Sequence, residues 1–160
     1  MRVDDVKLDD GVVTKREIVE HRGAAAIVPV LEDGRVVLVR QYRYAATTEL
    51  LEIPAGTLKS NENPKECALR ELEEETGYRS GELTKMLECF VAPGYSTEKI
   101  HIYLARRLTQ TQTKLDEDES ISIERLRFSE ALDKIRTGEI RDAKSMVGLQ
   151  AAKRLLTDVA

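Results

Sequence analysis

The feature that most constrains this chain is an acidic segment, residues 62–75, enclosed by glycines at positions 56 and 77. Asn63 is a favoured N-cap and Pro64 suits the first position of a helix, so a helix is predicted to begin there. Gly77 is the expected left-handed stop at the other end. The sequence therefore predicts a capped helix over residues 64–76.

The acidic residues of this helix are unevenly distributed around its axis. At 100° per residue, three glutamates share one sector, while Glu73 falls on the opposite flank. The three that share the sector are Glu71, Glu74 and Glu75. The predicted buried stripe consists of Ala68, Leu69 and Leu72.

Clustered carboxylates need a counter-charge. Glu71 and Glu75 are four residues apart, and like charges at that spacing oppose an isolated helix by roughly 0.2–0.5 kcal/mol. Mg²⁺ prefers oxygen ligands and is commonly held by one or two carboxylates together with substrate phosphates. Arg70 lies close enough to Glu74 to pair with one of the carboxylates and fix its orientation. The pattern favours a divalent-metal site that binds a phosphorylated substrate.

A solvated helix face is the ordinary explanation of a charge run. It does not explain why Gly56, Glu62 and Gly77 stand in register with Arg70-Glu71 and Glu74-Glu75. Together these positions resemble the signature of the Nudix hydrolase superfamily. That resemblance implies metal-dependent cleavage of a nucleoside diphosphate linked to another group.

Composition sets limits on the other classes of function. The chain has 160 residues, 41% hydrophobic and 34% charged, which predicts one globular domain over residues 1–160. No apolar run is long enough for a membrane span, and a cytoplasmic location is expected. The net charge of −4 argues against a nucleic-acid partner. Cys67 and Cys89 lack metal-type spacing and are expected to be buried free thiols.

Strand patterns precede and follow the acidic helix, and two further helices end the chain, which predicts a mixed α+β fold. Residues 1–22 contain an antiparallel hairpin, with Asp10-Gly11 at its turn. The resemblance implies that the fold is a Nudix-type α/β/α sandwich with a mixed sheet. The expected strands are residues 3–8, 12–20, 24–31, 35–42, 50–53, 83–91, 100–107 and 121–126, and the later helices are 129–136 and 142–157.

Four segments outside the acidic helix indicate a subgroup. Pro93 is the sixteenth residue after Gly77, and a proline there is similar to the ADP-ribose pyrophosphatase subgroup. The segments 16–24, 39–43 and 51–56 resemble the same subgroup. The similarity extends from about residue 14 to about residue 150, which is most of the chain.

The resemblance also implies roles for particular residues. The metal ligands would be the Ala55 carbonyl oxygen and the carboxylates of Glu71, Glu75 and Glu119. Glu74 and Arg70 would act beside them, and Glu117 would be the catalytic base. Glu117 and Glu119 belong to the loop Leu115–Ile121, for which a solvated acidic loop is the alternative.

Further candidates would bind the rest of the substrate. Arg43, in preference to Arg40, is expected to clamp the diphosphate, because guanidinium matches phosphate oxygens; surface salt bridges are the alternative for both. Arg16 and Glu17 match positions that hold adenine in the subgroup. Glu52 matches a pocket carboxylate, with a structural role at its strand end as the alternative. Pro93 completes the substrate-binding set.

The activity implied by the resemblance is hydrolysis of ADP-ribose to AMP and ribose 5-phosphate, with Mg²⁺ or alternatively Mn²⁺. The open alternatives are another nucleoside diphosphate sugar, such as GDP-mannose, a dinucleotide, or a sensor that binds a nucleotide without cleaving it. N-terminal strands in this subgroup cross to a partner, and the adenine pocket draws on both chains. A homodimer with exchanged N-terminal strands is therefore expected.

Overall fold

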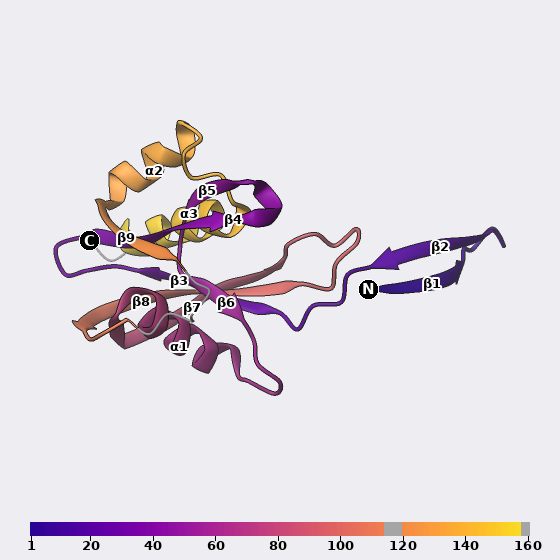
Figure 1. Ribbon diagram of the computed structural model, residues 1–160, viewed down its shortest axis with the longest axis horizontal. Helices are drawn as coiled ribbons and strands as arrows, with labels where there is room; N and C mark the ends of the chain where they lie inside the picture. The colour runs from indigo at the N-terminus through magenta and orange to yellow at the C-terminus, as the bar shows by residue number, and fades with distance from the viewer. Residues whose placement is uncertain (114–119, 158–160) are drawn as a thin grey trace.

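A computed structural model describes residues 1–113 and 120–157 of the chain. Over these residues, six strands precede the first helix, three strands follow it, and two helices come last (Figure 1). The strands are β1 (Arg2–Lys7), β2 (Val13–Ile18), β3 (Ala24–Pro29), β4 (Arg35–Arg43), β5 (Thr48–Glu52), β6 (Ala55–Thr57), β7 (Tyr78–Phe90), β8 (Lys99–Gln110) and β9 (Ile121–Arg127). The helices are α1 (Pro64–Thr76), α2 (Phe128–Arg136) and α3 (Ala143–Thr157), with a 3₁₀ turn at Tyr44–Ala46.

A four-stranded sheet with the order β6-β3-β8-β7 forms the centre of the molecule. Strands β3 and β8 are parallel and the other neighbours are antiparallel, so the sheet is mixed. Helix α1 covers one face and α3 the other (Figure 1). Each residue of β3 is buried, as expected for a strand covered on both faces.

A second sheet has the order β5-β4-β9 and packs with α2 and α3 around the same apolar core. Helix α3 approaches this core closely at Gly148. A Cβ atom there would lie 2.9 Å from Ile53 Cδ1 and 3.2 Å from Val28 Cγ2, so a larger residue would force these side chains to shift. The tight packing holds the start of α3 against the end of β5.

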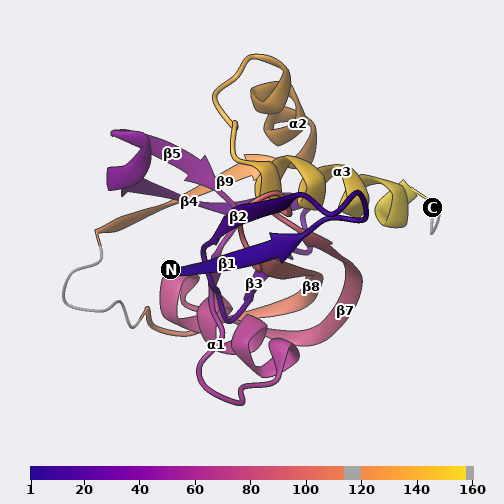
Figure 2. The ribbon, with the colours of Figure 1, turned by 90° about the vertical axis from the view of Figure 1, so that its right-hand side faces the viewer.

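The N-terminal hairpin, β1 paired with β2, projects away from the two sheets (Figure 1) and lies in front of them in the view of Figure 2. Its root is tied to the β7–β8 loop, because Val19 N donates to the Tyr95 carbonyl at 2.7 Å and Thr97 N donates to the Val19 carbonyl at 3.0 Å. Val3 and Val13 remain 55% and 65% exposed. An isolated two-stranded hairpin is only marginally stable in water.

The predicted α+β class and the α/β/α sandwich are confirmed, and α1 has the predicted bounds. The bounds of several strands differ by a few residues, and the main differences are the following. The short strand β6 was not predicted, and β7 begins at Tyr78, directly after the helix stop. Leu69 is only partly buried, and Cys67 joins Ala68 and Leu72 in the buried stripe instead. Among the described residues, no helix has the length and apolar character needed to cross a membrane.

Candidate functional site

Helix α1 is fixed at both ends by local interactions. Asn63 Oδ1 accepts a hydrogen bond from Lys65 N at 2.9 Å, with Pro64 at the first helical position. Gly77 adopts the left-handed conformation, with φ of 67°, and its N–H donates to the Glu73 carbonyl. These caps set the two ends of the helix that carries the acidic residues.

Arg70 gathers the acidic residues of this helix. Its Nη1 donates to Glu71 Oε1 at 2.6 Å and to Glu74 Oε2 at 2.8 Å, while its Nε and Nη2 bind Glu62 at 2.8 and 3.0 Å. The hydrogen bond from Arg70 lowers the pKa of Glu62 to about 2. The same hydrogen bond, which Arg70 donates to Glu62, raises the pKa of Arg70 above its usual value. Arg70 therefore orients two acids of the helix and is itself oriented by Glu62.

The loop at Ala55-Gly56 lies against two carboxylates of the helix, Glu75 and Glu71. Glu75 is 4% exposed, and its Oε2 accepts a hydrogen bond from Ala55 N at 3.2 Å. A Cβ atom at Gly56 would lie 1.9 Å from Glu71 Oε1, so the Glu71 carboxylate occupies the space that a side chain would need. Glu73 points elsewhere, where Arg79 binds it through two hydrogen bonds of 2.8 Å.

The donor set beside this loop fits a hard divalent cation. The carboxylates of Glu71, Glu74 and Glu75 and the backbone of Ala55-Gly56 supply oxygen atoms, which are the ligands that Mg²⁺ prefers. Within residues 1–113 and 120–157, no three acidic, histidine or cysteine side chains already stand together as a metal cluster, and Arg70 occupies Glu71 and Glu74. Burial raises the pKa of the neighbouring Cys67 thiol to about 12, so it stays protonated.

A cavity of about 260 Å³ adjoins the glycine loop. Its lining includes two cations, Arg43 from β4 and Lys144 from α3. Burial lowers the pKa of Arg43, but the hydrogen bonds that Arg43 donates to Glu52 and the charges of Glu52 and Glu75 raise it above its usual value. The cavity is lined by Ala24, Arg43, Ala55, Gly56, Thr57, Glu98, Ile100 and Lys144.

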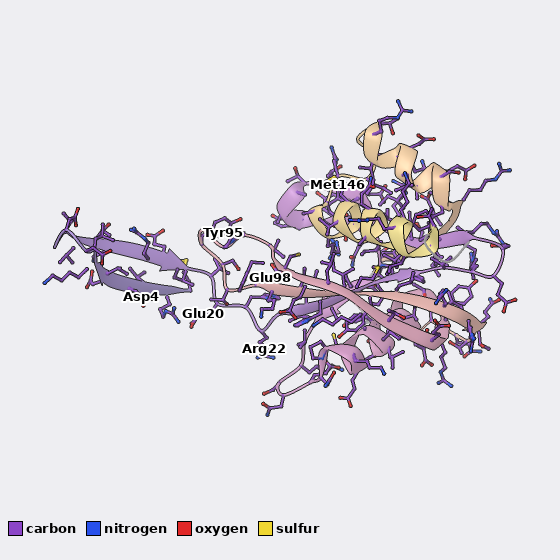
Figure 3. The ribbon with its side chains drawn as sticks, turned by 180° about the vertical axis from the view of Figure 1, so that it is seen from behind. Asp4, Glu20, Arg22, Tyr95, Glu98 and Met146 are labelled. Atoms are coloured by element: carbon purple, nitrogen blue, oxygen red, sulfur yellow. The ribbon has the colours of Figure 1, made fainter. Side chains whose placement is uncertain are left out.

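Lys144 and Glu98 line this cavity although the sequence pattern did not single them out. Lys144 lies near the start of α3, next to Asp142, whose Oδ1 accepts hydrogen bonds from Lys144 Nζ at 2.9 Å and from Ser145 N at 3.1 Å. The helix-start pattern at Asp142 could be recognised in the sequence. Nothing in the sequence indicates that this helix start meets β5. Figure 3 places Glu98 near the root of the hairpin.

The two candidate arginines of β4 lie in different surroundings. Arg43 lines the cavity and binds Glu52, with Arg43 Nη2 2.6 Å from Glu52 Oε2. Arg40 instead binds Glu124 at 2.6 Å and Glu139 at 2.9 Å and does not line the cavity. The salt-bridge alternative therefore describes Arg40, and Arg43 is the better candidate for binding a phosphate.

The remaining candidates are not assembled around this cavity within one chain. Arg16 and Glu17 lie on the projecting strand β2, where Arg16 Nη1 donates to the Lys15 carbonyl at 3.1 Å. Pro93 lines a different cavity, of about 320 Å³, between the hairpin root and the β7–β8 loop. Glu117 and Glu119 lie outside the described residues.

The fold and the site together define a class of protein: an α/β/α sandwich in which an acidic helix meets a glycine loop beside a cavity lined by Arg43 and Lys144. Comparison with known families supplies the family. The NUDIX domain matches residues 20–147, and the chain belongs to the NUDIX family.

Related proteins of known description share most of the chain. The ADP-ribose pyrophosphatase of Bacillus subtilis (strain 168) is 41% identical over 150 residues, which cover 92% of this chain and 81% of the relative. The methanol dehydrogenase activator of Bacillus methanolicus is 40% identical over 152 residues, covering 94% and 82%. The GDP-mannose pyrophosphatase of Escherichia coli O1:K1 / APEC is 37% identical over 155 residues, covering 89% and 81%.

A solved structure shares the fold. The crystal structure titled as an ADP compounds hydrolase superposes with a TM-score of 0.85 at 24% sequence identity. The alignment covers 100% of this chain and 94% of that chain. At this identity the likeness supports the fold and not a substrate.

Proposed function

We propose that this protein hydrolyses the pyrophosphate bond of ADP-ribose to give AMP and ribose 5-phosphate, with Mg²⁺ as the cofactor and Mn²⁺ as the alternative. The observation that carries the proposal is the position of the acidic helix. Glu71 and Glu75 meet the Ala55-Gly56 loop, and that same loop lines the cavity containing Arg43 and Lys144. The choice of ADP-ribose is supported by the Bacillus subtilis relative, which is 41% identical.

The chain's own residues divide the work. Arg43 and Lys144 bind the non-bridging oxygens of the diphosphate, which guanidinium and ammonium groups recognise by charge and hydrogen bonding. Arg70 keeps Glu71 and Glu74 in position. A bound divalent ion would supply charge neutralisation and a lowered pKa of water. It would be held by the Ala55 carbonyl, Glu71 and Glu75.

The acidic loop after β8 completes the proposed machinery. Glu119 is proposed as a further metal ligand and Glu117 as the base that accepts a proton from the attacking water. Glu74 stands beside the ligands. No covalent intermediate with the protein is needed, because a water molecule can attack phosphorus directly.

GDP-mannose is the second candidate substrate, because the Escherichia coli relative named for it is 37% identical over 89% of this chain. Another nucleoside diphosphate sugar or a dinucleotide would use the same diphosphate contacts. A non-catalytic sensor is the third candidate. The clustered Glu71, Glu74 and Glu75 argue against a sensor, since binding alone gives no reason to keep like charges together.

A product panel separates these candidates. ADP-ribose, GDP-mannose and diadenosine polyphosphates are incubated with the protein, with and without Mg²⁺, and the products are quantified by chromatography. The proposal predicts fastest turnover of ADP-ribose, dependent on the metal. Faster turnover of GDP-mannose would favour the second candidate, and binding without any product would favour the sensor.

We also propose that residues 1–160 form one Nudix domain that works as a homodimer. Support comes from the hairpin, which leaves Val3 and Val13 exposed and carries Arg16 and Glu17 away from the cavity of its own chain. In a dimer with exchanged N-terminal strands, residues 1–22 would contact the second copy, and Arg16 and Glu17 would reach its adenine pocket. We propose the cytoplasm as the location, which agrees with two free cysteines.

A further inference from the structure

Glu52 is a buried carboxylate that binds two cations at once. It lies at the end of β5 and is 2% exposed. Its Oε2 accepts hydrogen bonds from Arg43 Nη2 at 2.6 Å and from Lys144 Nζ at 2.7 Å, and Arg43 Nε lies 3.2–3.3 Å from both carboxylate oxygens. Arg43 and Lys144 line the cavity, whereas Glu52 lies behind them and is not part of the lining.

The two cations that bind Glu52 come from elements that are far apart in the sequence. Arg43 belongs to β4, the antiparallel neighbour of β5, while Lys144 is 92 residues away from Glu52 in sequence. The seating of α3 brings Lys144 there, because buried Ser145 Oγ accepts a hydrogen bond from Ile53 N at 2.8 Å. The Glu52 carboxylate therefore binds side chains from two separate elements, β4 and α3.

A purely stabilising role is a weak explanation for this arrangement. Taking a carboxylate and its partners out of water costs several kcal/mol per ion, and buried ion pairs are often no more stabilising than apolar residues of the same volume. Burial by itself raises the pKa of Glu52, but the hydrogen bond from Arg43 and the charge of Lys144 lower it below its usual value. Glu52 is consequently held as an anion with both partners in place.

Both cations keep hydrogen-bond donors for another ligand. Arginine has five N–H donors and lysine has three. Among the described residues, the bonds of Arg43 use Nε and Nη2, and Lys144 Nζ binds only Glu52 and Asp142. The Nη1 group of Arg43 and one N–H of Lys144 thus remain for a group that enters the cavity.

We propose that Glu52 is a positioning residue: it holds Arg43 and Lys144 as a pair whose remaining donors receive the diphosphate of the substrate. This inference rests on the proposed function for the identity of the substrate. Glu52 itself does not contact the substrate, in contrast to the pocket role expected for it from the resemblance. Because the pair binds the diphosphate before and during reaction, its loss acts mainly on KM.

The substitution Glu52→Gln tests this, because glutamine keeps the shape and removes the charge. If Glu52 positions the pair, KM for ADP-ribose rises at least about tenfold, with a smaller change in kcat. The affinity for inorganic pyrophosphate, measured by calorimetry, falls by a similar factor. If Glu52 were only a counter-charge, removing it would strengthen the attraction for anions, and pyrophosphate affinity would rise. That rise, or no change, overturns the proposal.

Two further variants separate position from charge. Glu52→Asp keeps the charge but shortens the reach to Arg43 and Lys144, and we expect it to weaken pyrophosphate binding; native affinity in this variant contradicts a positioning role. Glu139→Gln is the matched control. Glu139 is also an acid shared by an arginine of β4 and a lysine, Arg40 and Lys134, but neither lines the cavity. Its KM and pyrophosphate affinity should stay at native values.

The experiment also distinguishes failure of this inference from failure of the proposed function. If the native protein does not cleave ADP-ribose, the proposed function is wrong, while pyrophosphate titration still measures the effect of Glu52. If thermal unfolding shows that Glu52→Gln is not folded, the double variant Glu52→Gln/Lys144→Met replaces it, because it removes one charge of each sign. It should bind pyrophosphate more weakly than Lys144→Met alone, since Arg43 has then lost its anchor. Equal binding by these two variants overturns the proposal.

Discussion

Substituting Gly56 by alanine should separate the function of the site from the stability of the fold. The added Cβ would lie 1.9 Å from Glu71 Oε1 and 2.0 Å from Glu71 Cδ. An ordinary contact is at least 3.4 Å, so the carboxylate has to move by about 1.5 Å. The atoms in its way belong to the end of a flexible side chain, which can rotate, and Gly56 has no positive φ that alanine would strain.

The Gly56→Ala substitution should therefore reduce the catalytic rate more than the stability of the fold. A displacement of about 1 Å in a catalytic group can reduce the rate by about 100-fold, which corresponds to about 2.7 kcal/mol of transition-state stabilisation. We expect kcat/KM for ADP-ribose to fall by about that factor and the Mg²⁺ concentration for half-maximal rate to rise. Thermal unfolding should change by no more than about 4 °C, equivalent to about 1 kcal/mol for a chain of this size.

The double variant Gly56→Ala/Glu71→Ala provides the control. Without the Glu71 carboxylate the new methyl group has nothing to displace, so Gly56→Ala should have little further effect in the Glu71→Ala background. Steady-state rates of the four proteins give the coupling between the two positions. Additive losses would refute the reasoning, as would a Gly56→Ala protein with native activity.

Three other predictions follow from the structure. The hydrogen bond from Arg70 lowers the pKa of Glu62 from 4.5 to about 2. A lowered pKa contributes stability above pH 4.5 that is lost as pH falls towards 2, so the free energy of unfolding that Glu62→Gln loses relative to the native protein should shrink over that interval in urea unfolding. A loss that is independent of pH contradicts this. Ser145→Ala leaves the Ile53 N–H without its acceptor and should lower stability by about 1–3 kcal/mol, measured by urea unfolding; an unchanged midpoint argues against this bond. Sedimentation velocity should give a dimer at micromolar concentration, and a monomer would exclude the exchanged hairpin.

Much of the fold followed from local patterns in the sequence. Asn63, Pro64 and Gly77 determine the bounds of α1 through capping, which depends only on neighbouring residues. Helical periodicity also separated Glu73 from the other acids, and in the structure Glu73 pairs with Arg79 instead. The pairing of Arg70 with Glu74 was likewise predictable, because the two are four residues apart.

The details that escaped prediction depend on long-range packing. Strand β6 has only three residues, Ala55–Thr57, and it exists because β3 offers hydrogen-bond partners to it. Leu69 was expected inside, but Cys67 takes that place beneath the Gly56 carbonyl, with Sγ 3.6 Å from the oxygen. Lys144 could not be assigned to the site, because only the packing of α3 against β5 brings it to Glu52.

The most direct test of the account compares the native protein with Glu75→Gln in Mg²⁺-dependent release of AMP from ADP-ribose. Glu75 is buried beside Ala55, and glutamine has nearly the same shape, so the fold should be retained in circular dichroism and thermal unfolding. The account predicts AMP and ribose 5-phosphate from the native protein and a loss of several orders of magnitude in kcat for the variant. Native activity in a folded Glu75→Gln protein, or no metal-dependent cleavage by the native protein, would contradict it.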